Sequence, residues 1–467
     1  METYQQTRRS RWDSIARKRD HWQGLGRWYH KRLAEIYQYL VSPNQRVLEI
    51  GCGTGDLLAH LKPSRGTGID FSAEMIARAK QRHPELELHQ MDAHDLSGLE
   101  GEFDVIILSD TVNDLWDVQR ALEQTKRLCV PHTRLILNFY NQLWQLPLAA
   151  AQAFNLAAPM LDQNWLTTED INNMLHLAGF ENIRSMQEIL WPLPLGGFAD
   201  RFLVRLWPFR DFALSNFVVA RPMPQAEKEA SVSVVIAARN EAGNIKSIFE
   251  RVPKMGSGTE IIFVEGHSRD NTYETIADEI PLHPLTPSLL LRQPGIGKAD
   301  AIRAGFDRAA GDILMILDAD LTVPPEDLPR FYDAIVSGKG EFINGVRLVY
   351  PMEKEAMRTL NFIGNKFFSM AFSWLLGQPI KDTLCGTKVM WRTDYQEIAA
   401  NRAYFGDFDP FGDFDLIFGA AKLNRKIVDL PIRYRERTYG TTNISRWKHG
   451  LLLLRMVAFA ARRIKFV

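Results

Sequence analysis

Residues 47–58 read VLEIGCGTGDLL, an apolar run that passes through three glycines into a helical pattern. A buried strand, a glycine turn and a helix in this order are typical of a parallel sheet covered by helices. Gly51, Gly53 and Gly55 have no Cβ, so the backbone can approach a ligand closely where the strand ends. The stretch predicts an α/β fold with a ligand site at this strand end.

The whole chain has the composition of a globular protein with more than one domain. It has 467 residues, 46% of them hydrophobic, and a formal net charge of zero, so nothing indicates nucleic acid as a partner. Cys52, Cys129 and Cys385 lie far apart, which favours a reducing, cytoplasmic compartment. Basic residues gather within residues 8–19 and 446–465, either as solvated faces or as contacts to an anionic membrane surface. No stretch approaches the roughly 20 uncharged apolar residues that span a bilayer, and the N-terminus does not resemble a signal peptide.

A polar stretch with two prolines, RPMPQAEKEAS at residues 221–231, separates two halves of the chain. Apolar strand-like runs flank it, so we predict a linker between domains at residues 1–220 and 232–467. In both halves, short runs rich in Val, Ile and Leu alternate with longer helical patterns, as in parallel sheets. The strands predicted from these runs are residues 46–50, 66–70, 86–90, 103–109 and 134–140 in the first half, and residues 232–238, 260–266, 312–318 and 341–347 in the second.

The glycine turn does not have the spacing of a dinucleotide-binding site. Such a site requires its third glycine at position 56, where this chain has Asp56. The pattern E-x-G-x-G-x-G at residues 49–55 instead resembles the first motif of class I S-adenosylmethionine-dependent methyltransferases. The resemblance covers about residues 40–140 and implies a Rossmann-like fold, a mostly parallel sheet and S-adenosylmethionine as cofactor. The cofactor-binding residues that it implies are Glu49, Gly51, Gly53, Gly55, Asp70, Asp92, Ser109 and Asp110.

These residues have separate roles in the family. Asp70 ends the second predicted strand about 20 residues after the glycine turn, where an acid can bind both ribose hydroxyls. Asp92 stands where the family reads the adenine amine, and the loop at Ser109 faces the donor methyl group. Methyl transfer depends mainly on alignment, so the sequence does not identify the methyl acceptor. Tyr29 and His30, in an N-terminal helical cap, could line the acceptor site, although packing of the cap is the simpler explanation.

Two carboxylates, Asp318 and Asp320, end the apolar part of ILMILDADLTVPP at residues 313–325. Residues i and i+2 of a strand point to the same side, so both side chains can converge beyond the carboxyl edge of the sheet. Two carboxylates this close require a cation, and their hard oxygen atoms suit Mg²⁺ or Mn²⁺. We therefore predict a metal site here, with a helix-capping turn before Pro324 and Pro325 as the alternative.

Three segments precede this pair in a characteristic order: VSVVIAARNEAGNI, EIIFVEGHSRDNT and GIGKADAIRAGFDRAAGD. The order resembles the nucleotide-sugar (GT-A) domain of family 2 glycosyltransferases over about residues 231–445. In particular it resembles the branch of dolichol-phosphate-mannose synthase and the polyprenyl-phosphate glycosyltransferases. Glu265 stands where the family has the first aspartate of its D-D-G-S motif, and the second acid of that motif is missing here. The resemblance therefore does not determine which base the nucleotide carries. The residues implied for nucleotide-sugar binding are Ala238, Arg239, Asn240, Glu241, Glu265, Asp270, Lys298, Asp318 and Arg437.

The acceptor can be a phosphate or a hydroxyl. A phosphate monoester is already a dianion at neutral pH and needs little help from a general base. A hydroxyl needs one, and Asp413 and Asp415 stand where hydroxyl-using relatives have a catalytic acidic pair. Attack opposite the leaving nucleotide predicts inversion at the sugar carbon. The residues implied for acceptor binding are Arg347, Arg358, Asp382 and Gly386.

Together these motifs predict a bifunctional enzyme. The second half transfers a sugar from a nucleotide sugar to a polyprenyl phosphate or related acceptor, and the first methylates a substrate of the same pathway. The alternative is transfer to a glycan or other hydroxyl, with the first half as a non-catalytic S-adenosylmethionine-binding or docking module. Residues 189–209, 360–380 and 449–467 are apolar and amphipathic, so they could rest on the cytoplasmic face of a membrane, or simply pack within the protein.

Overall fold

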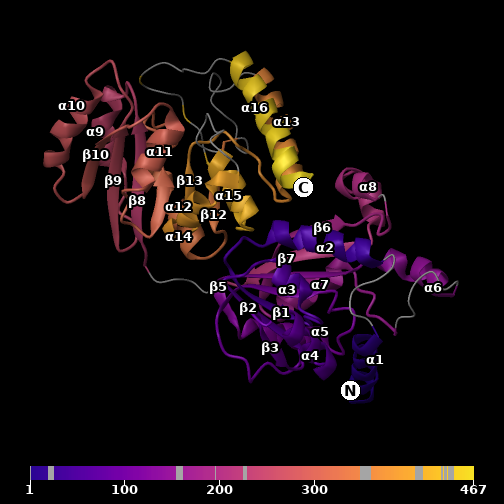
Figure 1. Ribbon diagram of the computed structural model, residues 1–467. Helices are drawn as coiled ribbons and strands as arrows, with labels where there is room; N and C mark the ends of the chain where they lie inside the picture. The colour runs from indigo at the N-terminus through magenta and orange to yellow at the C-terminus, as the bar shows by residue number, and fades with distance from the viewer. Residues whose placement is uncertain are drawn as a thin grey trace. The chain divides into compact units, whose positions relative to one another are not determined.

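The computed structural model describes residues 2–18, 26–153, 161–194, 196–224, 229–347, 359–404, 414–432, 435, 439 and 446–466. The chain divides into two compact units, Met1–Met223 with Phe466–Val467, and Pro224–Lys465. Each unit has one seven-stranded sheet with helices packed on it (Figure 1). The last strand of the first unit ends at Pro222 and the first strand of the second begins at Ser231, so their connection lies inside the stretch predicted as a linker.

The first sheet has the strand order β3-β2-β1-β4-β5-β7-β6. Strands β1 to β5 pair in parallel, and β7 runs antiparallel to β5 and β6. The predicted mostly parallel sheet is therefore confirmed. The strands are β1 (Arg46–Ile50), β2 (Arg65–Asp70), β3 (Glu87–Gln90), β4 (Phe103–Ser109), β5 (Cys129–Tyr140), β6 (Phe180–Glu188) and β7 (Ser215–Pro222). The helices are α1 (Glu2–Lys18), α2 (Gly26–Leu40), α3 (Asp56–His60), α4 (Ala73–Arg82), α5 (Val118–Lys126), η1 (Gln142–Trp144), α6 (Gln145–Ala153), α7 (Thr168–Leu177), α8 (Gly197–Arg201), η2 (Leu203–Arg205) and η3 (Phe209–Phe212).

Helices bury both faces of this sheet. Along β4, Ile106 and Leu108 belong to a core cluster that includes residues of α5 and α7. Val105 and Ile107 point to the other face, where they belong to a cluster that includes residues of α2. Because both faces are buried, the strand reads in the sequence as a continuous apolar run rather than as an alternation.

The second sheet has the strand order β10-β9-β8-β11-β13-β12-β14. β13 runs antiparallel to β11 and β12, and the remaining pairs of this sheet are parallel. The strands are β8 (Ser231–Ala238), β9 (Gly258–Glu265), β10 (Ser288–Arg292), β11 (Ile313–Ile316), β12 (Phe342–Val346), β13 (Lys388–Trp391) and β14 (Ile427–Pro431). The helices are α9 (Ala242–Arg251), α10 (Thr272–Glu279), η4 (Ile280–Leu282), α11 (Lys298–Phe306), η5 (Pro325–Asp327), α12 (Leu328–Val336), α13 (Thr359–Leu376), α14 (Arg392–Ala400), η6 (Arg402–Tyr404), α15 (Phe414–Lys422), α16 (Arg446–Ala460) and η7 (Ala461–Lys465).

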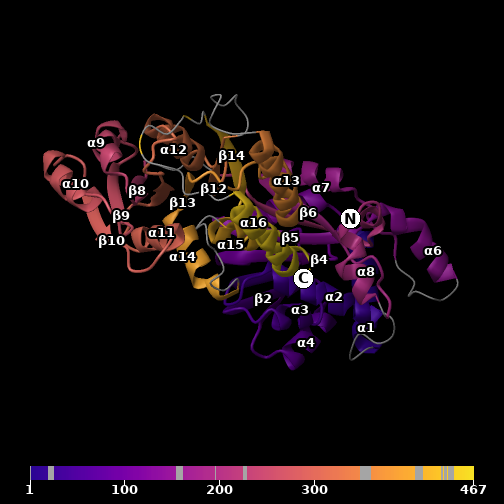
Figure 2. The same cartoon turned by 90° about the horizontal axis from the view of Figure 1, so that it is seen from above.

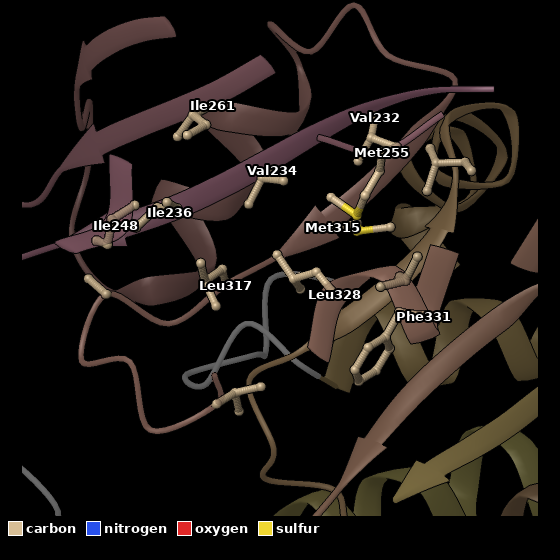
Figure 3. Packing of buried hydrophobic residues seen from close by; sticks show 14 of the residues in the cluster. Val232, Val234, Ile236, Ile248, Met255, Ile261, Met315, Leu317, Leu328 and Phe331 are labelled. Carbon is tan, nitrogen blue, oxygen red and sulfur yellow. The ribbon is translucent and has the colours of Figure 1, made fainter. Parts of the chain in front are cut away.

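A core cluster joins this sheet to helices α9 and α12, as Figure 3 shows from close by. Val234 and Ile236 of β8, Met315 of β11, and Leu328 and Phe331 of α12 are all fully buried. Each such side chain stabilises the fold by about 1.5–3 kcal/mol when it leaves water. This packing holds β8 and β11 side by side. It thereby also fixes the ends of these strands, where residues predicted to bind the nucleotide sugar lie.

The structure corrects the predicted end of β11. The sequence predicts a strand up to Asp318, but the strand ends at Ile316. Leu317 N still donates to Val235 O (3.1 Å), and the chain then turns, with Leu321 N donating to Asp318 O (3.2 Å). Leu321 has a φ of +56°, which no strand residue adopts. The alternation of a strand therefore does not apply to the two carboxylates, and a turn positions them.

The sequence does not predict β10, β13 and β14. In β10 and β14 most residues are at least partly exposed, and β13 begins with the buried Lys388. None of the three has the long apolar run by which a buried parallel strand is recognised. β13 and β14 pair with strands far away in the sequence, so tertiary contacts and not local pattern define these two as strands.

The three segments predicted to be amphipathic form different structures. Residues 189–209 contain the short helical turns α8, η2 and the start of η3 instead of one helix. α13 and α16 are continuous helices that pack against each other (Figures 1 and 2). Among the described helices, none combines the length and the apolar character that crossing a bilayer requires.

Candidate active sites

The glycine turn after β1 forms part of the wall of a cavity of about 580 Å³ in the first unit. Gly51, Gly53 and Gly55 have φ values of +76°, +52° and +76°, in the left-handed region that favours glycine. A Cβ on Gly53 would meet no atom within 4 Å, whereas one on Gly51 would come 2.5 Å from Oγ1 of Thr111. Gly55 faces His83 and does not line the cavity. The other seven residues predicted for the cofactor do line it: Glu49, Gly51, Gly53, Asp70, Asp92, Ser109 and Asp110.

Asp70 ends β2 next to this turn. Its Oδ2 accepts a hydrogen bond from Gly53 N (3.0 Å) and its Oδ1 accepts one from Ser72 N (2.9 Å). Burial raises the pKa of Asp70 to about 6, although the two backbone bonds favour the ionised form. The backbone thus fixes this carboxyl group in the cavity wall.

Glu49, on β1, has a buried carboxyl group that lacks full hydrogen bonding. The residue is 3% exposed, and its Oε2 has no hydrogen-bond partner among the residues that the structure describes. Burial raises the pKa of Glu49 to about 8, with Asp70 and Asp56 adding to the effect. Leaving such a group unpaired costs about 1–3 kcal/mol, which a ligand with a cationic or hydrogen-donating group would offset.

Asp92 and Asp110, which follow β3 and β4, are hydrogen-bonded by side chains from other elements. Asp92 Oδ2 accepts from Gln5 Nε2 of α1 (2.8 Å), and Asp92 Oδ1 lies 2.6 Å from His94 Nδ1. Asp110 Oδ1 accepts from the Tyr29 hydroxyl of α2 (2.7 Å). Burial raises the pKa of Asp110 to about 6. The two N-terminal helices therefore bind directly to the strand ends that surround the cavity.

Helix α1 forms one wall of the cavity. Tyr4, Arg8 and Trp12 line it, and their spacing of four residues places them on one face of the helix. Arg8 is 5% exposed; its Nε lies 3.3 Å from Oδ1 of Asp114, and Trp12 Nε1 donates to the same carboxylate (3.2 Å). The expectation that the basic residues of this end are solvated or meet a membrane is therefore wrong for Arg8. The four-residue spacing of aromatic and basic residues is the signal that could have identified this wall.

Of the two cap residues considered from the sequence, His30 lines the cavity and Tyr29 does not. Tyr29 is buried, and its hydroxyl contacts both Asp110 and Ser215 Oγ (3.1 Å). Burial lowers the pKa of His30 to about 4, so its imidazole is neutral at pH 7. Packing accounts for Tyr29, while His30 lies in the cavity wall.

In the second unit, Asp318 forms an ion pair with Lys298. Lys298 Nζ lies 2.6 Å from Asp318 Oδ1, and the two side chains are 30% and 27% exposed. Burial would raise the pKa of Asp318, but Lys298, Lys388 and Arg347 outweigh it and hold this pKa below its usual value. Asp318 is therefore ionised at neutral pH.

Asp320 lies two residues further on in the same turn. Its Oδ1 accepts hydrogen bonds from Thr322 N (3.1 Å) and Thr322 Oγ1 (2.7 Å). Ala319 is buried between the two partly exposed acids. Within the described ranges, no group of three or more His, Cys, Asp or Glu side chains that could hold a metal ion occurs, but Mg²⁺ commonly binds to one or two carboxylates together with substrate phosphates. The turn thus presents two carboxylates within three residues.

Two loops at neighbouring strand ends carry most of the residues predicted to bind the nucleotide. Ser268 connects them, because its N donates to Glu265 Oε1 (2.5 Å) and its Oγ accepts from Asn240 N (3.0 Å). Glu241 N donates to Thr272 Oγ1 (3.0 Å), which in turn bonds to Asp270. The two loops are therefore tied into one structure. The predicted residues are Ala238, Arg239, Asn240 and Glu241 at the end of β8, and Glu265 and Asp270 at the end of β9.

Two residues predicted to bind the acceptor, Arg347 and Gly386, lie close to Asp318, and a third, Asp382, is bonded to Arg347. Arg347 Nε and Nη2 donate to the two oxygens of Asp382 at 2.7 and 2.9 Å, and Asp382 is 2% exposed. Burial would raise the pKa of Asp382, but Arg347 and Lys388 outweigh it and lower this pKa. A Cβ on Gly386 would come 1.9 Å from Asp318 Oδ2, so only glycine leaves room for that carboxylate.

Asp415, on α15, is 7% exposed and held by two arginines. Its Oδ2 accepts from Arg303 Nη2 (2.8 Å) and Arg402 Nε (3.1 Å). Both guanidinium groups thus bind the same oxygen of this carboxylate. The remaining predicted residues Asp413, Arg358 and Arg437 lie outside the described residues.

Comparison with known proteins identifies both units. Residues 25–185 match the family model of a methyltransferase domain, and residues 233–398 match glycosyl transferase family 2. The chain therefore contains a Rossmann-like methyltransferase domain and a GT-A domain of family 2.

Two curated relatives match the second unit. The undecaprenyl-phosphate 4-deoxy-4-formamido-L-arabinose transferase of Yersinia enterocolitica is 36% identical over 232 residues, 48% of this chain and 66% of that protein. The dolichol-phosphate mannosyltransferase of Pyrococcus furiosus is 34% identical over 109 residues, 23% of this chain and 30% of that protein. The chain thus spans less than two thirds of the length of either relative.

Solved structures resemble each unit at low identity. A SAM-dependent methyltransferase from Thermotoga maritima aligns with a TM-score of 0.34 and 19% identity, over 43% of this chain and 91% of that one. Glucosyl-3-phosphoglycerate synthase from Mycobacterium tuberculosis aligns with a TM-score of 0.38 and 17% identity, over 50% of this chain and 79% of that one.

Replacing Glu49 by Gln is expected to stabilise the ligand-free protein at pH 8 by about 1–3 kcal/mol, because it removes a buried, incompletely bonded carboxylate. The pKa of Glu49 is about 8 in the folded protein against 4.5 for an ordinary glutamate. Between these values the folded protein binds more protons than the unfolded chain, so the contribution of Glu49 to stability falls as the pH rises.

Urea unfolding of wild type and variant from pH 5 to pH 9 measures this effect. Glu100→Gln, at an exposed glutamate, is the matched control and should leave the pH dependence unchanged. If Glu49→Gln and the wild type lose stability equally between pH 5 and pH 8, the cost assigned to Glu49 is wrong.

Proposed function

We propose that the second unit transfers a sugar, with inversion, from a nucleotide sugar to a polyprenyl phosphate, with Mg²⁺ or Mn²⁺ held by Asp318 and Asp320. The observation that carries this proposal is the turn after β11, where an ionised and partly exposed carboxylate lies beside Lys298 in a family 2 glycosyltransferase domain. Departure of a nucleoside diphosphate requires positive charge near its phosphates, and a metal and a lysine supply it.

The residues of this turn fit a divalent cation. Carboxylate oxygens are the ligands that Mg²⁺ and Mn²⁺ prefer, and both acids are partly exposed. When bound, the ion would supply positive charge to the diphosphate. Asp318 and Asp320 would hold it from the protein side, and Lys298, at the first residue of α11, would approach the same phosphates. The loops that end at Glu241 and Asp270 would hold the nucleoside.

Two observations support a phosphate as acceptor. The names of the matching relatives specify undecaprenyl phosphate and dolichol phosphate. Asp415, which a hydroxyl acceptor would require as a base, is instead engaged by Arg303 and Arg402. A phosphate acceptor needs no such base, because it is already charged at neutral pH.

The pair of helices α13 and α16 supports contact with a membrane surface. Phe367, Met370 and Trp374 of α13 and Leu451 and Leu454 of α16 are between 37% and 66% exposed. Neither helix contains an acidic residue. Exposed apolar side chains without acids suit the interface of a bilayer with anionic lipids, where a polyprenyl phosphate would lie. We therefore propose that the enzyme acts at the cytoplasmic face of a membrane.

For the first unit we propose S-adenosylmethionine-dependent methylation of a substrate in the same pathway. The cavity fits the cofactor in three respects. A ligand can approach the backbone at Gly53, and backbone bonds fix Asp70 where a ribose would bind. Within the described part of the chain, Glu49 Oε2 has no hydrogen-bond partner. S-Adenosylmethionine supplies an activated methyl group when bound. The protein's part is alignment of donor and acceptor and exclusion of water.

Nucleotide sugars incubated with the protein and Mn²⁺ are expected to release nucleoside diphosphate, and a short-chain polyprenyl phosphate should increase the rate. Asp318→Asn and Asp320→Asn should each lower kcat about 100-fold or more, because each variant weakens binding of the metal whose positive charge stabilises the departing diphosphate. Asp278→Asn, on the exposed face of α10, is the control. Release that is unchanged in the presence of EDTA would rule out the metal-dependent reaction.

Asp415→Asn distinguishes the two acceptor classes. With a phosphate acceptor, kcat of the folded variant should stay within about threefold of wild type, whereas loss of a general base would lower it about 100-fold or more. Arg303→Lys disturbs the same ion pair without removing the acid and serves as the structural control. A large loss of kcat in Asp415→Asn alone, with a shifted pH profile, would favour a hydroxyl acceptor.

Calorimetry with S-adenosylmethionine tests the first unit. The wild type should bind it, and binding near pH 7 should release a proton, since a cationic ligand lowers the raised pKa of Glu49. Gly53→Arg should abolish binding by filling the cavity, while Gly26→Ala, at a position with no atom within 4 Å of the added Cβ, should not. Absence of binding by the wild type would leave this unit as a docking module.

A further inference from the structure

The carboxylate proposed to bind the metal already has a cation as its neighbour. Lys298 Nζ lies 2.6 Å from Asp318 Oδ1, a short charge-assisted hydrogen bond. Both side chains are partly exposed, so the pair lies in contact with solvent and not in the core. Lys298 follows Gly297, whose φ is +94°, at the start of α11. The lysine is therefore anchored at a helix start, with a long side chain that can change its partner.

The second carboxylate oxygen of Asp318, Oδ2, has little room to move. Oδ2 lies against Gly386, where an added Cβ would come within 1.9 Å of it. Two further cations influence Asp318, but both have their own partners. Lys388 is fully buried and donates to Cys385 O, and Arg347 is bound through two nitrogens to Asp382. Of the three cations near Asp318, Lys298 thus has the most exposed side chain.

We propose that Lys298 and the divalent metal compete for Asp318, and that the diphosphate of the donor decides the competition. Without donor, Lys298 neutralises Asp318 and the metal binds weakly. When the donor arrives, its phosphates attract the lysine and the metal together, and Lys298 passes from the carboxylate to the diphosphate. Metal and nucleotide therefore bind cooperatively. This inference rests on the metal-dependent glycosyl transfer proposed above.

The electrostatics favour this order. A divalent ion and an ammonium group that share one carboxylate repel each other at a few ångströms, and the repulsion is strong in a partly desolvated site. A diphosphate adds two or more negative charges, enough to attract both cations at once. Coupled binding of this kind is reciprocal, so nucleotide must tighten metal binding by the same factor as metal tightens nucleotide binding.

Mn²⁺ binding to the full-length protein, followed by electron paramagnetic resonance of the free ion, tests the proposal. It is measured without nucleotide and with saturating UDP or GDP, in the wild type and in Lys298→Met. In the wild type, nucleotide should tighten Mn²⁺ binding about tenfold or more. In Lys298→Met, Mn²⁺ alone should bind about tenfold more tightly than to wild type, and nucleotide should tighten Mn²⁺ binding by a smaller factor than in wild type, because only the direct attraction between the diphosphate and the metal remains. Lys246→Met, at an exposed lysine of α9, should behave as wild type.

Two results would overturn the competition. One is equal Mn²⁺ affinity of the wild type with and without nucleotide; the other is unchanged Mn²⁺ affinity of Lys298→Met without nucleotide, in a variant whose circular dichroism shows it folded. The absence of Mn²⁺ binding under every condition, with nucleotide bound all the same, would instead overturn the metal-dependent donor site itself. The experiment thus separates failure of the competition from failure of the proposed function.

Discussion

Carboxyl groups that lie partly or fully out of solvent set the electrostatics of both units. Parallel strands end at one edge of a sheet, so their terminal residues are brought together at a place suited to ligands. In the first unit burial raises the pKa of Glu49 and of Asp70, because backbone bonds offset only part of the desolvation. In the second unit, cations outweigh burial and lower the pKa of Asp318, which follows β11, and of Asp382, which lies in the segment before β13.

This difference matches the charge of the ligands proposed for each unit. A cavity lined by more carboxyl groups than cationic side chains suits S-adenosylmethionine, whose sulfonium and ammonium groups outweigh its one carboxylate. A turn that already has Lys298 beside Asp318 suits an anionic nucleotide sugar, because the negative charge of its diphosphate must be balanced by cations. The same kind of α/β topology therefore forms one site suited to a cationic ligand and one suited to an anionic ligand. The residues that follow each strand decide which kind of ligand a site binds.

Each site also depends on an element from outside its sheet. In the first unit α1 reaches the strand ends through Gln5 and Arg8, which contact Asp92 and Asp114. In the second, Gly386 makes room for Asp318 from a segment that leads into β13. Such contacts make both sites sensitive to changes far from the glycine turn and from the acidic pair, since a shift of either segment changes the charge balance around a partly buried carboxyl group.

The sequence by itself determined the two α/β units, the glycine turn at Gly51–Gly55 and the acidic turn at Asp318, because all of these follow from local patterns of apolar runs, glycines and acids. Only the tertiary structure decided where β11 ends, that Lys298 pairs with Asp318, and that α1 closes the cavity. It also decided that Asp415 is engaged by Arg303, which precedes it by 112 residues. The reason is physical: a residue's type and spacing predict its local conformation, but its charge partner is chosen by chain folding that brings distant segments together, and no local pattern records that choice.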